Sequence, residues 1–326
     1  MAISNIEYLR EIIDREIEKM KFPLRQPSEL YLPVDYIMSN GGKRLRPVLA
    51  LLACQIFSDN LDNCIKPGVA IELFHNFTLL HDDIMDKADM RRNKPTVHKK
   101  WDENTAILSG DAMVVLSFDL ISSADRQTLP RFLEVFNKTA LEVCEGQQMD
   151  INFESAQRVT EQMYIEMIRL KTSVLIAAAM KIGAIAGQAS ETDADLMYES
   201  GLNLGLAFQL QDDLLDLYGE QKEFGKKSGG DIIMNKKTFL LIKALEMAKP
   251  DIVKRITYLM EEEKNPDTKV IEVKKIFDTL EIKTITAIKA DDFFKKSIEN
   301  LNRITHAGER KNELIDFIKT VMKRKY

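Results

Sequence analysis

The stretch that decides the fold is PGVAIELFHNFTLLHDDIMD, residues 67–86. Proline at its start suits the first turn of a helix, and the apolar residues after it show no alternation of the kind found in strands. The stretch therefore predicts one long helix that ends in three carboxylates, those of Asp82, Asp83 and Asp86. Residues i and i+4 share a helix face, so Asp82 and Asp86 lie side by side, with Asp83 about 100° round the axis.

The carboxylates at this helix end need a cation beside them. Like charges at i and i+4 destabilise a helix, and crowded carboxylates raise each other's pKa unless a cation neutralises them. Oxygen ligands on one face, with room for waters and phosphate oxygens, suit Mg²⁺. A solvated acidic helix face is the ordinary alternative for a single motif of this kind.

A second acidic motif repeats the first. The segment QLQDDLLD at 209–216 echoes the LLHDDIMD that ends the first stretch, and it too follows a run of apolar residues. Asp212 and Asp216 are spaced i and i+4, Asp213 is adjacent, and Gln209 lies one turn earlier on the same face. Two such copies favour a magnesium site over an acidic surface.

Helical spacing of apolar residues continues through most of the chain. Glycine (14) and proline (9) are scarce, which disfavours a β-rich chain with many turns. Neither an alternating strand nor a flexible linker is evident, so we predict a single all-α domain over residues 1–326. Pro23, Pro27 and Pro33 break the pattern after the first helix, and the most mobile segment is expected at Glu220–Asn235. The other helices are expected at 3–20, 47–56, 105–122, 130–153, 161–187, 193–219, 236–248, 251–262, 269–291, 293–303 and 307–323.

Composition excludes several classes of protein. The apolar content of 45 % excludes global disorder. The net charge of −5 is acidic, whereas a nucleic-acid binder usually has an excess of basic residues. The three cysteines, Cys54, Cys64 and Cys144, form neither a disulfide framework nor a zinc motif, which predicts a reducing, cytoplasmic location. The N-terminus is charged throughout, unlike a signal peptide. The longest apolar stretch, Val48–Phe57, is far shorter than the ~20 residues of a membrane span, so no transmembrane segment is expected.

Basic residues near both acidic motifs suit an anionic ligand. The segment GGKRLRP at 41–47 is a flexible cationic loop that leads into a helix, whose N-terminus adds its dipole. Arg91 and Arg92 follow the first motif, and an ordinary surface patch is the alternative for each basic run. His75 lies two turns before Asp82 and shares its face, so it is either a substrate contact or a satisfied core histidine. Four lysines follow the second motif: Lys226, Lys227, Lys236 and Lys237.

Together these motifs resemble the trans-isoprenyl diphosphate synthase (polyprenyl synthetase) family. The resemblance implies an all-α bundle of long helices around a deep central cavity, usually assembled as a homodimer. Members join isopentenyl diphosphate to an allylic diphosphate. The matching stretches fall in order over most of residues 41–237: GGKRLRP at 41–47, HNFTLLHDDIMDKADMRRNKPTVH at 75–98, KT at 171–172, and FQLQDDLLDLYG with GKKSGGD within 208–231.

The resemblance also implies roles for individual residues. The Mg²⁺ that bridges the allylic diphosphate is bound by Asp82, Asp86 and Asp212, with support from Asp83, Asp213 and Asp216. The allylic diphosphate is contacted by Arg91, Lys171, Thr172, Gln209, Lys226 and Lys236. The isopentenyl diphosphate site comprises Lys43, Arg46, His75 and Arg92, and some members carry glutamine in place of this histidine.

The implied reaction begins with magnesium-assisted ionisation of dimethylallyl, geranyl or farnesyl diphosphate. The isopentenyl double bond attacks the cation, which Thr172 and Gln209 hold through their dipoles, and a proton is then lost to the departing diphosphate. Product length depends on the cavity below the first motif, where bulky Phe77 beside small Thr78 implies geranylgeranyl or farnesyl diphosphate. Ordinary core packing is the alternative for Phe77, since a helical wheel places it roughly 140° from Asp82.

Three other functions stay open from the sequence. A longer-chain polyprenyl diphosphate synthase shares every motif. A terpene cyclase shares the fold and an aspartate-rich first motif, but it generally carries a different second motif and lacks a GGKR segment. A non-catalytic subunit of a heteromeric synthase tends to lose an aspartate motif, and this chain keeps both.

Overall fold

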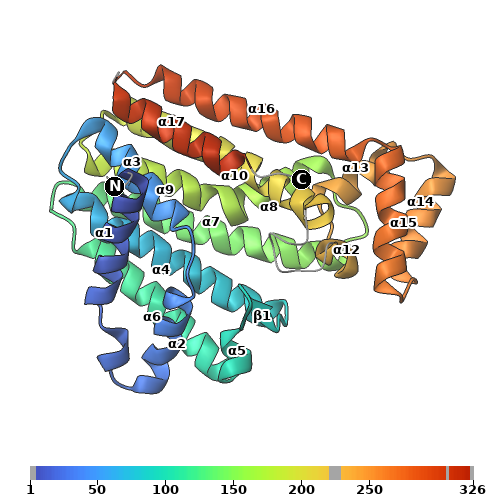
Figure 1. The fold of residues 1–326 in the computed structure, drawn as a ribbon, viewed down its shortest axis with the longest axis horizontal. Coiled ribbons are helices and arrows are strands. Elements are labelled where there is room, and N and C mark those ends of the chain that lie inside the picture. Colours follow the sequence, from blue (N-terminus) through green and yellow to red (C-terminus); the bar gives the residue numbers. More distant parts are fainter. Residues whose placement is uncertain (1–4, 220–228, 306–307, 324–326) are drawn as a thin grey trace. The chain divides into compact units, whose positions relative to one another are not determined.

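Helices make up nearly all of the computed structural model, which describes residues 5–219, 229–305 and 308–323 (Figure 1). Within these ranges the single sheet is a small hairpin, with β1 (Met90–Arg91) antiparallel to β2 (Lys94–Pro95). The predicted all-α fold is confirmed. The chain divides into two compact units, and the single domain stays a prediction. Unit 1 comprises Met1–Lys138, Leu175–Tyr198 and Ile304–Phe317, and unit 2 comprises Thr139–Val174, Glu199–Arg303 and Ile318–Tyr326.

Unit 1 is built around two adjacent helices, α3 and α4. α3 is buried from Pro47 to Ile56, because its own residues are apolar on nearly every side of the helix. α4 lies beside α3 and beside α6, as Figure 1 shows for α6. The complete elements of this unit, apart from the hairpin, are α1 (Asn5–Lys19), η1 (Phe22–Leu24), α2 (Ser28–Ser39), α3 (Leu45–Phe57), α4 (Asp62–Met85), α5 (Val97–Lys100) and α6 (Glu103–Ser122). It also contains residues of α7 (Leu129–Ser155), α9 (Val174–Ala186), α10 (Glu191–Tyr218) and α17 (Glu309–Met322).

Unit 2 carries the second acidic motif on its part of α10. Its core includes Leu214, Leu240, Ile256 and Phe277, each at most 2 % exposed, and Leu214 anchors the last turns of α10 in this core. The complete elements of this unit are α8 (Glu161–Ile168), the π-helical turn η2 (Arg169–Ser173), α12 (Gly230–Ile233), α13 (Phe239–Met247), α14 (Pro250–Glu261), α15 (Pro266–Thr279) and α16 (Ile282–Arg303).

Helix boundaries follow the predictions except at a few places. Pro33 lies inside α2, where a break was expected, and Pro67 lies in the second turn of α4 rather than its first. Both prolines are buried, and this packing outweighs the loss of one backbone hydrogen bond. The helix expected at 161–187 contains the π turn. The break between helices expected at residue 292 lies instead at Glu281, just before α16. Glu281 has a left-handed φ of 55°, and because the residue is not a glycine the sequence gives no sign of this turn.

α6 is the one described helix that is long and apolar enough, by length and composition alone, to cross a membrane. A third of the most apolar 18-residue stretch of this helix is buried inside the protein. A helix in the core of a soluble protein can have the same length and apolar composition. Ser109 of α6 is buried and donates from its hydroxyl to the Leu30 carbonyl of α2 at 3.0 Å. The expected lack of a transmembrane segment stays a prediction.

Candidate active site

The first acidic motif lies at the C-terminal end of α4, in unit 1. Asp82 and Asp86 are one turn apart, and both are partly exposed. Asp83 is 3 % exposed and pairs with Arg91 of β1, whose Nε lies 2.8 and 2.9 Å from the two carboxylate oxygens. Burial raises the pKa of Asp83, and the Arg91 guanidinium opposes that rise. Asp83 thus ties the hairpin to the helix end, and Asp82 and Asp86 are the pair that solvent reaches.

Three arginines lie near His75 in the same unit. Burial lowers the pKa of His75 well below its usual value, and the charges of Arg46, Arg92 and Arg91 lower it further. The imidazole is therefore neutral at pH 7. A neutral ring among three cations favours an anion-binding cluster over a histidine satisfied within an apolar core. Lys43, the remaining predicted member of this group, is exposed on the loop before α3.

The second acidic motif lies on the unit 2 part of α10. Asp212 and Asp216 are partly exposed, whereas Asp213 is 5 % exposed. Asp213 accepts hydrogen bonds from the Tyr164 hydroxyl at 2.5 Å and from the Gln209 amide nitrogen at 3.1 Å. Burial raises the pKa of Asp213 to about 7, although both donors lower it. Asp213 is thus held inside the protein, and Asp212 and Asp216 are the carboxylates that solvent reaches.

The segment from Gly229 onward lies against this motif. The Asp216 carboxylate accepts the N–H of Asp231 at 3.0 Å, and the Asp216 carbonyl oxygen accepts the N–H of Gly229 at 2.7 Å. These two bonds anchor the start of α12, a short helix that the sequence did not predict. Gly229 has a φ of 84°, which suits glycine at this turn.

The four predicted lysines do not share one role. Lys226 and Lys227 lie outside the described residues, as does the part of the predicted mobile segment at 220–228. Lys236 is partly exposed just after α12. Lys237 donates from Nζ to the carbonyl of Phe153 at 2.6 Å and to that of Ala156, at the C-terminal end of α7. Lys237 therefore caps a helix, whereas the contact of Lys236 with the allylic diphosphate stays a prediction.

Lys171 and Thr172 lie in η2, a π-helical turn of the kind found frequently at functional sites. Thr172 donates from Oγ1 to the Gln209 side-chain carbonyl at 3.0 Å, and Gln209 in turn donates to Asp213. Lys171 pairs with Asp150 of α7 at 2.6 Å. Unit 2 therefore brings the π turn that carries Lys171 and Thr172 against Gln209, which lies 37 residues after Thr172.

Two glycines let neighbouring helices approach the π turn closely. A Cβ on Gly146 of α7 would overlap the backbone nitrogen of Lys171, and one on Gly205 of α10 would overlap the Cα of Ser173. No side chain other than hydrogen fits at either position unless the turn moves. Neither glycine was predicted from the sequence.

Asp150 and Tyr164 were not predicted from the sequence either. Asp150 follows Gly146 at i+4 on a long helix, and this spacing could have indicated a close, polar helix contact. Tyr164 carries no comparable signal, because an isolated tyrosine on an amphipathic helix fits ordinary core packing equally well. Its contact with Asp213 becomes visible only in the folded chain.

Phe77 belongs to an aromatic row on α4. Its ring packs against Phe74 and His81, with centroid separations of 5.3 and 4.7 Å, and it is partly exposed. Thr78 donates from Oγ1 to the His75 carbonyl at 2.7 Å, so its hydroxyl is used within the helix. The role of Phe77 in product length stays a prediction.

The carboxylates fit a hard cation that is bound partly by its substrate. Mg²⁺ takes oxygen ligands, and it commonly keeps waters and phosphate oxygens beside one or two carboxylates. In the described ranges, no three His, Cys, Asp or Glu side chains converge as a ready-made metal site. Each partly exposed pair, taken by itself, fits such a cation and leaves the rest of its coordination to waters and phosphate oxygens.

Comparison with known proteins gives the family. Residues 27–280 match the family described as Polyprenyl synthetase. The chain is 43 % identical over 236 residues to the geranylgeranyl diphosphate synthase of Methanosarcina mazei, with 72 % of each chain covered. It is 37 % identical over 272 residues to the short chain isoprenyl diphosphate synthase of Methanocaldococcus jannaschii, with 83 % of this chain and 82 % of that one covered. A crystal structure of a geranylgeranyl pyrophosphate synthase is 42 % identical, with a TM-score of 0.93 over 99 % of this chain and 100 % of that one.

The fold and the paired acidic motifs define an isoprenoid synthase-type prenyltransferase. The chain belongs to the polyprenyl synthetase family. The prediction of a short-chain trans-isoprenyl diphosphate synthase is confirmed. This membership favours prenyl transfer over the cyclase alternative.

Proposed function

We propose that the protein condenses isopentenyl diphosphate with dimethylallyl, geranyl or farnesyl diphosphate and releases geranylgeranyl diphosphate. The observation that carries this proposal is the group of three arginines near neutral His75, in the same unit as the Asp82 and Asp86 pair. Cations and an exposed carboxylate pair suit two anionic ligands, one bound directly and one through a metal. The Methanosarcina mazei relative is named for this product.

The proposed cofactor is Mg²⁺. When bound, it neutralises the allylic diphosphate as that group leaves. Asp83 and Asp213 act from inside the protein, because each is buried and fixed by a donor, Arg91 or Tyr164. The ligands are the carboxylates that solvent reaches: Asp82, Asp86 and Asp212, with Asp216 in support.

Isopentenyl diphosphate binds the cations of unit 1. Lys43, Arg46 and Arg92 supply the charge, and the two guanidinium groups can each donate two parallel hydrogen bonds to diphosphate oxygens. His75 is neutral, so it donates from one ring nitrogen without adding a fourth charge to the cluster. The diphosphate is held at one end, and the double bond at the other end stays available to attack.

The allylic cation forms beside Thr172 and Gln209. Thr172 donates its single hydroxyl proton to Gln209, so the oxygen lone pairs of Thr172 are left to face the cation. The isopentenyl double bond supplies the electron pair for the new carbon–carbon bond, and the proton lost afterwards passes to the departing diphosphate. No side chain acts as a nucleophile. The allylic diphosphate itself is bound by cationic side chains: Arg91, Lys171, Lys226 and Lys236.

The proposed assembly is a homodimer formed through α6. Ile107, Leu108 and Val115 of this helix are 43, 59 and 68 % exposed and lie on one face. These three exposed apolar side chains lie around exposed Asp111, and covering them with a second copy would account for the apolar composition of α6. The proposed location is the cytoplasm, in keeping with three cysteines that are all free thiols. Light scattering that gave the mass of a single 37.3 kDa chain would contradict the dimer.

One incubation tests the proposed function. The purified protein is mixed with Mg²⁺, isopentenyl diphosphate and each allylic diphosphate in turn, and the products are identified by mass. A series that stops at geranylgeranyl diphosphate is expected from all three primers. Products beyond that length would move the assignment to a longer-chain synthase. A hydrocarbon released from an allylic diphosphate alone would indicate a cyclase, and no reaction at all would indicate a non-catalytic subunit.

A further inference from the structure

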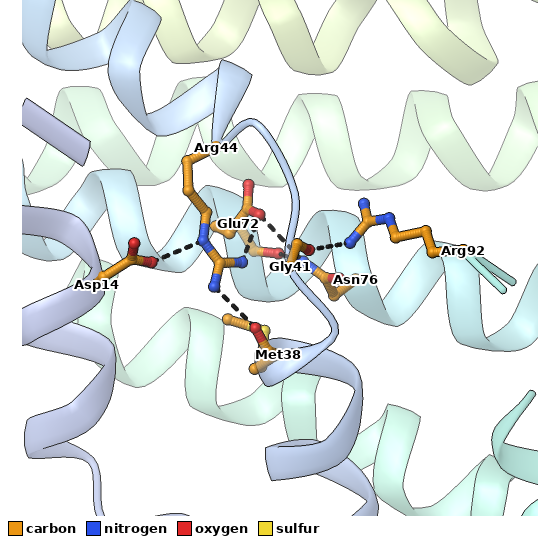
Figure 2. Close-up of polar contacts among 7 residues, drawn as sticks. All are labelled: Asp14, Met38, Gly41, Arg44, Glu72, Asn76 and Arg92. Atoms are coloured by element: carbon orange, nitrogen blue, oxygen red, sulfur yellow. Dashed lines mark hydrogen bonds and ion pairs between the residues drawn. The ribbon is translucent and has the colours of Figure 1, made fainter. Parts of the chain in front are cut away.

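Arg44 of the GGKRLRP loop is buried, with 7 % of its surface exposed. Figure 2 shows its guanidinium between three acceptors from three different elements. Nε donates to Asp14 of α1 at 2.9 Å, Nη1 to Glu72 of α4 at 3.0 Å, and Nη2 to the Met38 carbonyl at the end of α2 at 2.7 Å. The planar guanidinium can serve three acceptors in fixed directions, whereas a lysine ammonium presents a single point charge on a flexible stem.

The charge of Arg44 is balanced inside the protein. Burial alone would lower the pKa of Arg44, but the carboxylates of Glu72 and Asp14 raise it above its usual value. Glu72 is 3 % exposed and accepts a further hydrogen bond from the Asn76 amide at 3.3 Å, also drawn in Figure 2. Buried ion pairs contribute little net stability, so the contribution of this one lies in the geometry that it fixes.

That geometry belongs to the loop. Arg44 has a φ of 47°, in the left-handed region that residues other than glycine rarely adopt. The three side-chain bonds hold it there, and its carbonyl oxygen accepts the first helical bond of α3 from Val48 at 3.0 Å. The backbone at Arg44 therefore fixes where Lys43 leaves the loop and where α3, whose first turn carries Arg46, begins.

The same loop also holds Arg92. The Gly41 carbonyl accepts a hydrogen bond from Nη1 of Arg92 (Figure 2). Gly42 has a φ of 144°, and a Cβ there would lie 3.1 Å from the same nitrogen, so glycine is required for this approach. Arg46 and Arg92 are both close enough to His75 to lower its pKa. The loop thus contacts Arg92 and leads into the first turn of α3, which carries Arg46, so it bears on two of the three cations near this histidine.

We propose that Arg44 is a positioning residue for isopentenyl diphosphate, which acts by fixing the loop that presents Lys43, Arg46 and Arg92 and does not touch the substrate. The inference rests on the proposed function, because those three side chains are assigned to that substrate there. Its specific consequence is that loss of the Arg44 fork weakens the binding of isopentenyl diphosphate. The allylic substrate, whose proposed contacts do not include the loop, is bound as before.

Arg44→Lys tests the proposal, because it keeps the positive charge and removes the three-way fork. Steady-state kinetics are measured with isopentenyl diphosphate and farnesyl diphosphate varied in turn. We expect the KM for isopentenyl diphosphate to rise about tenfold, while kcat and the KM for farnesyl diphosphate change less than about twofold. Unchanged kinetics, or an equal loss for both substrates, would overturn the positioning role.

Two further variants guard against a purely structural effect. Glu72→Gln keeps an oxygen acceptor for Arg44 and removes the carboxylate charge. It should therefore raise the KM for isopentenyl diphosphate by about threefold. This variant replaces Arg44→Lys as the test if Arg44→Lys does not fold. Ile256→Ala opens a cavity in the core of unit 2, where Ile256 is fully buried, and should lower stability without moving that KM. An equal rise in Ile256→Ala would overturn the inference. If the wild-type protein formed no product, both the proposed function and this inference would be overturned. If the wild type is active and the kinetics of Arg44→Lys are unaltered, only the inference is overturned.

Discussion

The Tyr164 hydroxyl donates a 2.5 Å hydrogen bond to the Asp213 carboxylate, and both side chains are buried. This bond joins α8 to the turn of α10 that carries Asp212. Gln209 donates to the other oxygen of the same carboxylate and accepts from Thr172 in the π turn. The second acidic motif and the π turn are therefore connected by one continuous chain of hydrogen bonds in unit 2.

Removal of the Tyr164 hydroxyl should weaken both the fold and the reaction. In Tyr164→Phe one oxygen of buried Asp213 loses its donor, which lowers the free energy of unfolding by about 1–3 kcal/mol. Because Asp212 and Gln209 lose a fixed neighbour, kcat should fall about tenfold with little change in the KM for isopentenyl diphosphate. Urea unfolding and steady-state kinetics measure the two effects. Tyr258→Phe, at a residue that is 49 % exposed, is the control, and an unaltered kcat in Tyr164→Phe would refute a role in positioning.

The stability of the metal-free protein should carry a pH dependence that originates at Asp213. Its pKa is about 7 in the folded chain and about 3.8 ordinarily, so the folded state holds this proton more tightly. Well below pH 4 both states are protonated, and as pH rises from about 4 to 7 the unfolded chain releases this proton first, so the folded state loses stability relative to it. Asp213→Asn has no proton to release, so its stability relative to wild type should rise between about pH 4 and pH 7. Urea unfolding with a chelator present measures the difference, and a difference independent of pH would contradict the assignment.

Gly205→Ala should displace the π turn. The added Cβ meets the backbone of Ser173, which cannot move aside as a flexible side chain could. We expect a loss of about 1–3 kcal/mol in the free energy of unfolding and a clear fall in kcat, because Thr172 is next to Ser173. Gly68→Ala on α4 is the matched control, since its Cβ would approach the end of the Ile13 side chain at 3.3 Å. Equal effects of the two substitutions on kcat would show that the π turn has no special role.

Phe77→Ala should lengthen the product. The ring that packs between Phe74 and His81 is removed, and the space that it leaves can admit further isoprene units. Products made from farnesyl and isopentenyl diphosphate are compared by mass for the variant and the wild type. Leu116→Ala on α6, at a partly buried apolar position, is the control. A product of wild-type length would reduce Phe77 to core packing.

The acidic motifs could be predicted from the sequence because their geometry is local. The i, i+4 spacing of Asp82 and Asp86, and of Asp212 and Asp216, follows from helix periodicity alone. The helices themselves were also predictable, since long runs with helical spacing leave few other folds. The break at Glu281 was missed, because its left-handed backbone has no glycine or proline to indicate it.

What the sequence could not show depends on contacts between distant segments. α7 and α10 approach the π turn at Lys171 closely through Gly146 and Gly205, and no local pattern encodes that approach. Lys236 and Lys237 look equivalent in the sequence, but the Lys237 ammonium donates a hydrogen bond to the Phe153 carbonyl at the end of α7. Arg44 is a further example. It is a basic residue in a basic loop, but its side chain is buried and bonds to three other elements inside the protein.

The most direct test of the account compares the wild type with Asp82→Ala and Asp212→Ala in the condensation of farnesyl with isopentenyl diphosphate. Asp292→Ala, an exposed acidic position on α16, serves as the control, and circular dichroism confirms that each variant is folded. We expect Mg²⁺-dependent product from the wild type and the control, none after chelation, and a loss of at least about 10³ in kcat for both motif variants. Near-normal turnover in both Asp82→Ala and Asp212→Ala, or turnover by the wild type in excess chelator, would contradict the account.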